Sequence, residues 1–231
     1  VGLFCIYTGF WGFYAACNIP IFDLGPEYGL GDGVTFFTAT NIYVTPTTLS
    51  GITMNFLMSL SGGLLAGYWV SKGDPFWTYS GGLAGIITAS AGNDLYHPIQ
   101  SMIIAGVGTY IAYKMHYWVE RKFKIDDAVG AVAVHGYAGV VGLIICGFVL
   151  WGYPSSGYDG LGYAAINPVG MIIGAFIMFV VLGFIPGYVI AKILHAAGKL
   201  RIPREVELAG LDYNIMEAAS KDEKAVSSSS R

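Results

Sequence analysis

Charged residues are scarce in this sequence, and their scarcity excludes an ordinary soluble domain. Asp, Glu, Lys and Arg make up 12% of the 231 residues, whereas soluble domains contain about 25%. Hydrophobic residues account for 55% of the chain, and its mean hydropathy is +0.59. Long uncharged runs of this kind indicate a polytopic membrane protein embedded in a lipid bilayer.

Cysteines and basic clusters are also few, which excludes further classes of protein. The three cysteines (Cys5, Cys17 and Cys146) are odd in number and lie inside apolar runs, so they do not indicate a disulfide or zinc framework. We see no basic stripe and expect no nucleic-acid partner. The chain starts with a valine inside an apolar run. We therefore expect a fragment that lacks its N-terminal part, rather than a signal peptide.

Six apolar segments are long enough to cross a bilayer, which takes about 20 residues. They cover residues 1–20, 46–70, 76–93, 98–119, 127–151 and 168–195. We assign residues 1–198 to a transmembrane domain. Residues 199–231 form a polar tail whose serine-rich end we expect to be disordered.

The starts of these segments carry signals for helix N-termini. A capping side chain precedes a proline at Thr45-Pro46, Asp74-Pro75 and Asn167-Pro168. His97-Pro98 repeats the proline without a strong cap. Asp126 and Asp127 place negative charge at the start of the fifth segment, where the helix dipole favours it. Pro186 predicts a kink in the sixth.

Basic residues predict the orientation. If the segments alternate in direction, all 12 Lys and Arg residues lie in the last part of the second, fourth and sixth segments or after them, and share one side. The opposite loops hold only acids: Asp23, Glu27, Asp32, Asp94 and Asp159. Because positive charge concentrates on the cytoplasmic side, we predict a cytoplasmic C-terminus.

His135 stands out in the run KIDDAVGAVAVHGYAGVVGLIICGFVLWG, residues 124–152. It lies about nine residues, or about 13 Å, into the fifth segment, close to the middle of a membrane core of about 30 Å. Ala and Gly dominate the positions that share its helical face. A membrane-embedded ionisable residue indicates function, here hydrogen bonding or proton relay. The structural alternative is a hydrogen bond between helices. No companion ligand on this segment has the spacing of a metal site.

Other rings have plainer interpretations. Trp69, Trp77 and Trp118 are expected to anchor the protein at the membrane interface. Three further histidines lie at the ends of segments, where we expect them to be solvated: His97, His116 and His195.

Four stretches resemble the ammonium transporter family (Amt/Mep/Rh). DDAVGAVAVHGYAGVVG is similar to the signature around that family's second pore histidine, and three other stretches agree in order: GFWGFYAACN, GGLAGIITASAG and IPREVELAGLDYN. The resemblance reaches about residue 214. It implies an all-α polytopic membrane protein, built as two inverted five-helix halves plus one helix, about eleven in total. The six transmembrane helices here would form the second half plus the last helix, with the partner histidine missing.

The resemblance also implies roles for individual residues. His135 corresponds to one of two hydrogen-bonded pore histidines, and Phe13 to a phenylalanine of the stacked gate. Phe10 stands where tryptophan is usual, Cys17 where many members have a serine near the outer recruitment site, and Thr88 at a pore-side threonine. Two departures are Tyr14 in place of asparagine, and the absence of Glu-His-Gly after Asp212.

The function implied is ammonium transport for nitrogen uptake, with methylammonium also accepted, and neither enzymatic activity nor a cofactor. Ammonium would be recruited, pass the phenylalanine gate, lose a proton and travel along a histidine-lined hydrophobic pore. Family members are usually homotrimers of the plasma or inner membrane, and many bind a PII-type signalling protein on the cytoplasmic face.

Two alternatives come from other classes. The same fold can act as an ammonium sensor, coupled through its tail to a signalling domain. A six-helix aquaporin is rejected, because it needs two Asn-Pro-Ala motifs and only Asn167-Pro168-Val169 approaches one. We also expect this chain not to transport alone, because half of the pore wall is missing.

Overall fold

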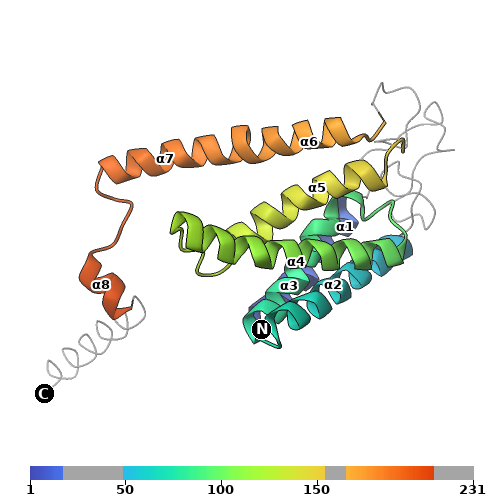
Figure 1. Cartoon of the computed structure of the whole chain (residues 1–231), viewed down its shortest axis with the longest axis horizontal. Coiled ribbons are helices and arrows are strands. Elements are labelled where there is room, and N and C mark those ends of the chain that lie inside the picture. Colours follow the sequence, from blue (N-terminus) through green and yellow to red (C-terminus); the bar gives the residue numbers. More distant parts are fainter. Residues whose placement is uncertain (18–48, 154–164, 211–231) are drawn as a thin grey trace, which may run out of the picture. The chain divides into compact units, whose positions relative to one another are not determined.

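The computed structural model describes residues 1–17, 49–153 and 165–210 (Figure 1). Regular structure in these ranges is helical, without a strand among the described residues. The all-α fold expected from the sequence is therefore confirmed. The chain divides into two compact units, Val1–Phe179 and Val180–Arg231.

The first unit is a bundle of helices whose bounds follow the predicted segments closely. Its elements are α1 (Gly2–Cys17), α2 (Leu49–Ser71), α3 (Pro75–Ala89) with the 3-10 turn η2 (Ser90–Gly92), α4 (Pro98–Phe123), the π-helical η3 (Val132–Tyr137) that continues into α5 (Ala138–Val149), and α6 (Pro168–Phe176). Among the described residues, three continuous helices are long and apolar enough to cross a membrane by themselves: Leu49–Ser71, Val132–Val149 and Pro168–Ala196.

The second unit contains most of the last predicted segment. The π-helical η4 (Ile177–Phe184) leads into α7 (Ile185–Ala196), and the short α8 (Arg204–Ala209) follows. The wide turns of η4 end at Phe184, two residues before Pro186, which cannot donate a backbone hydrogen bond to the preceding turn. Lys192 places its Nζ 5.3 Å from the centre of the Tyr188 ring on the same helix.

Two of the predicted caps are present as expected. Asp74 Oδ1 accepts a hydrogen bond of 2.9 Å from Trp77 N, and Asn167 Oδ1 accepts one of 2.7 Å from Gly170 N. The prediction of a weak cap at His97 was wrong. His97 Nδ1 accepts from Ile99 N at 3.3 Å, while Gln100 Oε1 accepts from His97 N at 2.9 Å, a reciprocal arrangement that satisfies two backbone donors. Thr45-Pro46 lies outside the described residues.

The fifth helix begins later than predicted. The chain turns at Gly130, which has a φ of +68°, and the regular π-helical turns begin at Val132 instead of residue 127. Asp127 nevertheless serves this helix start, because its carboxylate accepts hydrogen bonds from Val132 N at 3.1 Å and Ala133 N at 3.0 Å. Asp126 is exposed.

Glycine lets α2 and α3 touch through their backbones. A Cβ atom on Gly85 of α3 would lie 2.7 Å from the Cα of Gly63 on α2, closer than real Cβ contacts allow. Thr109 on α4 donates a 3.0 Å hydrogen bond to the carbonyl of Gly81 on α3. Small residues and hydroxyl groups of this kind hold membrane helices together where burial of apolar surface cannot.

Two expectations about rings near the helix ends were wrong. Trp77 is only 3% exposed and packs inside the bundle, so it is not an interface anchor; Trp69 and Trp118 are exposed. His116 is buried as well, and is not solvated. Its ring is enclosed by Trp77 and Tyr117, with centroids 5.0 and 4.9 Å away. Their positions near the ends of predicted segments did not reveal that a neighbouring helix covers these rings.

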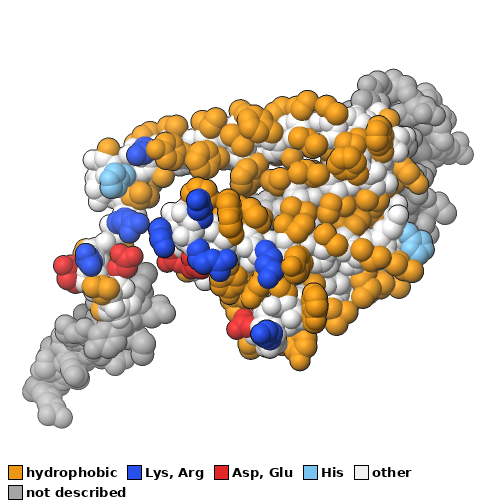
Figure 2. All heavy atoms as spheres, viewed as in Figure 1, with side chains coloured by type: hydrophobic (Ala, Val, Ile, Leu, Met, Phe, Trp, Pro, Cys, Tyr) orange, Lys and Arg blue, Asp and Glu red, His pale blue; other side chains and the backbone are white. Residues whose placement is uncertain are grey.

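Basic residues of the first unit gather over the ends of α2 and α4 (Figure 2). Lys72, directly after α2, and Lys114 on α4 line one hollow of about 600 Å³ together with Tyr68, Trp69 and Tyr110. The two helices therefore bring their basic ends to the same side of the bundle, as the alternating direction of the segments predicts.

Candidate functional site

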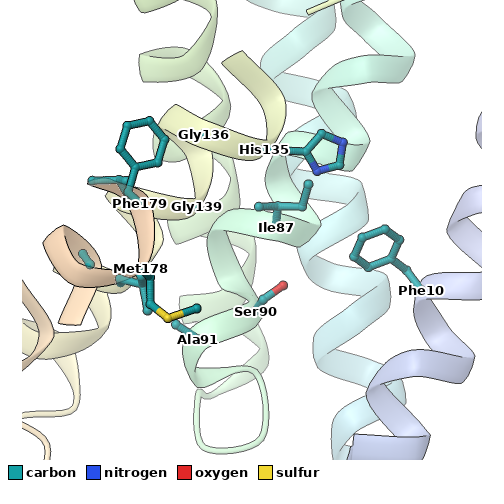
Figure 3. A pocket seen from close by; sticks show the side chains of 12 residues that line it. Phe10, Ile87, Ser90, Ala91, His135, Gly136, Gly139, Met178 and Phe179 are labelled. Carbon is teal, nitrogen blue, oxygen red and sulfur yellow. The ribbon is translucent and has the colours of Figure 1, made fainter. Parts of the chain in front are cut away.

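A cavity of about 450 Å³ in the first unit is lined by residues of α1, α3, η2, η3, α5, α6 and the start of η4. Its wall is almost wholly apolar or glycine. His135 and Ser90 supply the polar side chains, and Phe10, Ile87, Gly136 and Gly139 are among the remaining lining residues (Figure 3). Such a mostly apolar hollow with few polar groups is the usual form of a small-molecule site.

His135 presents its imidazole ring openly at this wall. The side chain is exposed in the described structure, and Figure 3 shows the rings of His135 and Phe10 on the same side of Ile87 of α3. The glycines Gly136 and Gly139 leave space beside the ring, because neither adds a side chain to the cavity. An ionisable group thus faces a space where few other polar atoms can compete for a ligand.

His135 lies well inside the bundle along the direction of α4, although the helix start was predicted wrongly. Asp127 lies beside His116, about two turns or 10 Å before the end of α4 at Phe123. His135 follows Val132 by about 5 Å more. It therefore stands roughly 15 Å from the end of α4, a helix of 26 residues and about 39 Å.

Ser90 was not predicted as a site residue. Its hydroxyl donates to the carbonyl of Ile86 at 2.8 Å and also contacts the hydroxyl of Tyr14. Because Ser90 stands three residues after Ile87 on the same helical face, helical spacing could have suggested that both line one wall.

The aromatic residues of α1 form a continuous set. Phe10 and Phe13 have ring centroids 6.2 Å apart at an angle of 66°, and both contact Tyr14. Phe10 lines the cavity that holds His135, whereas Phe13 is 58% exposed and lines a second hollow, of about 380 Å³, with Phe10, Ile6 and Gly9. Phe10 is thus the residue that the two hollows share.

Thr88 and Cys17 are placed differently from these rings. Thr88 is fully buried and is not among the residues that line the cavity; its Oγ1 donates to Ala84 O at 2.8 Å. A Cβ atom on either Gly108 of α4 or Gly142 of α5 would clash with Thr88, so three helices meet there. Cys17 is the last residue of α1, and its side chain lies outside the described part.

A second histidine is paired with an acid outside the cavity. His116 Nδ1 lies 3.4 Å from Asp127 Oδ2, and the two side chains are 9% and 10% exposed. Sequence reasoning missed this pair, because it joins α4 to the loop that follows it.

Comparison with known proteins decides the family. The model of the Ammonium Transporter Family matches residues 1–220. The chain belongs to the ammonium transporter family. The resemblance seen in four sequence stretches is therefore confirmed over nearly the whole chain, and with its apolar helices the chain is a multi-pass membrane protein.

Ammonium transporters of an archaeon and a bacterium are among the distant relatives of this ammonium transporter family member. It is 30% identical over 227 residues to ammonium transporter Amt1 of Methanocaldococcus jannaschii, covering 97% of this chain and 50% of that protein. It is 33% identical over 215 residues to Amt2 of the same organism, covering 91% and 43%. With the ammonium transporter of Bacillus subtilis it shares 30% over 178 residues, covering 73% and 44%. The chain thus spans half of these relatives' length, or somewhat less.

Metal ligands do not gather in the part of this family member that the structure describes. No group of three or more His, Cys, Asp or Glu side chains there could hold a metal ion.

Proposed function

We propose that this chain forms one half of a transmembrane path for ammonium, with His135 in the path. The observation that carries the proposal is the imidazole of His135, open to an apolar cavity and carried by the helix Val132–Val149, which is long and apolar enough to span a membrane. The curated relatives that the chain matches are named ammonium transporters. Methylammonium, which keeps a donating N–H group, would be accepted by the same chemistry.

The apolar wall suits transfer of neutral ammonia. A bare cation in this cavity would lose its hydration without gaining a fixed negative charge, which costs far more than burying a neutral molecule. Ammonium, unlike potassium, can avoid that cost by giving up a proton. A neutral imidazole offers one donor and one acceptor, so His135 can accept the proton or hold ammonia by a hydrogen bond.

The rings of α1 support a gate in front of this path. Phe10 touches both hollows, and the faces of Phe10 and Phe13 can attract a cation that has shed part of its water. We therefore assign the gate to the Phe10–Phe13 pair, with Phe10 on the side of His135. Cys17, at the outer end of α1 in our orientation, would lie near the recruitment site. Thr88 would act on the path indirectly, by fixing the junction of α3, α4 and α5.

Orientation and assembly complete the proposal. We place the basic ends of α2 and α4, and the C-terminal tail, in the cytoplasm, following the positive-inside tendency. We expect a homotrimer in the plasma or inner membrane, with a PII-type protein as a partner at the cytoplasmic face. Protease protection of a C-terminal tag in right-side-out vesicles tests the orientation; digestion of the tag from outside would contradict it.

The central experiment records charge movement in proteoliposomes containing the full-length protein after a jump in ammonium concentration. His135→Ala is compared with His195→Ala, a histidine substitution on α7 that leaves the cavity lining unchanged. We expect a saturable signal with ammonium and none with sodium, with loss of rate or selectivity only in His135→Ala. Ammonium flux measured in parallel by a pH-sensitive dye covers electroneutral transfer.

The possible failures point to different conclusions. Retained ammonium binding without current or flux would overturn transport and favour an ammonium sensor. Normal transport by His135→Ala, with unchanged selectivity against potassium, would remove His135 from the path while leaving transport itself intact.

A further inference from the structure

The helix that carries His135 is not continued by a helix before it. Residues 124–130 are non-helical, and two of them adopt left-handed backbone conformations, Lys124 with φ +58° and Gly130 with φ +68°. The π-helical turn Val132–Tyr137 therefore needs some other element to fix where it begins. π-helical turns are rare and are found mostly at functional sites, so its register has consequences for the ring it carries.

Asp127 supplies that fixed point. Its two carboxylate oxygens accept hydrogen bonds from two successive backbone donors of the first π-helical turn, Val132 N at 3.1 Å and Ala133 N at 3.0 Å. Both donors lie within three residues of His135. A movement of the carboxylate would therefore be transmitted directly to the backbone that positions the imidazole ring.

His116 holds Asp127 from the other side. Its Nδ1 lies 3.4 Å from Oδ2, the oxygen that also accepts from Ala133 N. Only about a tenth of each side chain is exposed, and a buried carboxylate without a partner is costly. Asp127 Oδ2 accepts one backbone hydrogen bond, from Ala133 N, and the imidazole of His116 offers it a second donor.

Aromatic rings fix the orientation of His116. Trp77 from α3 and Tyr117 from α4 meet its ring nearly edge-on, at interplanar angles of 71° and 85°. The backbone of Trp77 is itself held, because its N donates to the cap residue Asp74. The imidazole therefore meets Asp127 from one direction, so the contact sets a position instead of merely filling space.

We propose that His116 is a positioning residue for the ammonium path: through Asp127 it fixes the start and register of the π-helical turn that presents His135 to the cavity. The link from His116 to the backbone of Val132–Tyr137 stands on geometry alone, and its effect on transport rests on the proposed function. His116 is not among the residues that line the cavity.

The test compares three substitutions in the full-length protein. His116→Leu removes the donor. His116→Asn keeps one, because the amide nitrogen of asparagine reaches close to where Nδ1 stands. Tyr117→Phe is the matched control: it breaks the hydrogen bond from Trp77 in the same aromatic group but leaves the contact between His116 and Asp127 in place.

Two readouts are needed. Hydrogen–deuterium exchange of the peptide covering Val132–Tyr137 reports the helix start without any assumption about transport. We expect exchange about tenfold faster in His116→Leu, close to wild type in His116→Asn, and unchanged in Tyr117→Phe. Ammonium flux and its selectivity against potassium should follow the same order.

Each outcome decides the matter. Unchanged exchange in His116→Leu overturns the positioning role. Faster exchange with normal flux and selectivity restricts His116 to stability and also overturns it. If His116→Leu does not fold, His116→Asn still decides. Because asparagine keeps the donor, faster exchange and lower flux in His116→Asn than in wild type contradict a role for that donor. If wild type moves no ammonium, transport fails as a function, while the exchange comparison still tests the link to the helix.

Discussion

The hydroxyl of Tyr14 on α1 donates a 2.9 Å hydrogen bond to the backbone carbonyl of Ile86 on α3. The Tyr14 ring also packs edge-on against Phe56 of α2, with centroids 5.7 Å apart. One residue thus joins three helices, in a place where the family resemblance implied asparagine. Phe10 lies one turn before Tyr14, and Ile87 follows Ile86, so this joint lies next to two residues that line the cavity.

Tyr14→Phe should therefore loosen α1. Removing the hydroxyl deletes the buried hydrogen bond to Ile86 O, worth about 1 kcal/mol, together with the contact with the Ser90 hydroxyl, while the ring and its contact with Phe56 remain. We expect a lower unfolding temperature in detergent and a larger loss of ammonium over potassium selectivity than of maximal flux. Thr53→Val, which removes the hydrogen bond that Trp11 Nε1 makes at the outside of α1, is the control. Equal effects of the two substitutions would argue against a special joint at Tyr14.

Gly85→Ala tests the backbone contact between α2 and α3. The added methyl would lie 2.7 Å from the Cα of Gly63, and overpacking of this kind costs about 1–3 kcal/mol. Gly106→Ala is the matched control, because its methyl would meet no atom closer than 3.7 Å. Unfolding followed by circular dichroism in detergent should separate the two variants, and equal stability would contradict the close approach.

Gly139→Leu tests the cavity as a path. A Cβ atom at Gly139 would have only Ile87 Cγ2 within 4 Å, at 3.9 Å, so a larger side chain extends into the open space. We expect ammonium flux to fall by about tenfold or more, with little change in stability. Gly174→Leu adds the same side chain at a position with nothing within 4 Å and outside the cavity lining. Similar flux in both variants would show that the path lies elsewhere.

Asp94 gives the folded protein a pH dependence. Partial burial in the loop between η2 and α4 raises the pKa of Asp94 above its usual 3.8. The folded state then keeps this proton at pH values where the unfolded chain has lost it, so unfolding free energy falls as pH rises from about 4 through the folded-state pKa. Asp94→Asn should flatten that decline when unfolding temperatures are compared between pH 4 and 7. A decline as steep as that of wild type would assign it to another group.

Local features of the sequence decided a large part of this protein. Apolar runs and their length set the positions of the membrane helices, since hydrophobic residues must match the bilayer over a continuous stretch. The side chains of Asp74 and Asn167 determined two helix starts, because a cap acts on backbone groups only a few residues away. The motif around His135 led to the family, and the structure gave that ring an open place on a cavity wall.

Only the tertiary structure determined which side chains are buried by neighbouring helices and which line a cavity. In the folded protein Trp77 and His116 are buried, and His116 contacts Asp127. Thr88 does not line the cavity, whereas Phe10 lines both hollows. The regular turns of the fifth helix begin at Val132 and not at residue 127, because the backbone turns at Gly130 and Asp127 accepts a hydrogen bond from Val132 N instead of starting the helix. These outcomes depend on contacts between residues distant in the chain, which hydropathy, helical period and caps do not encode.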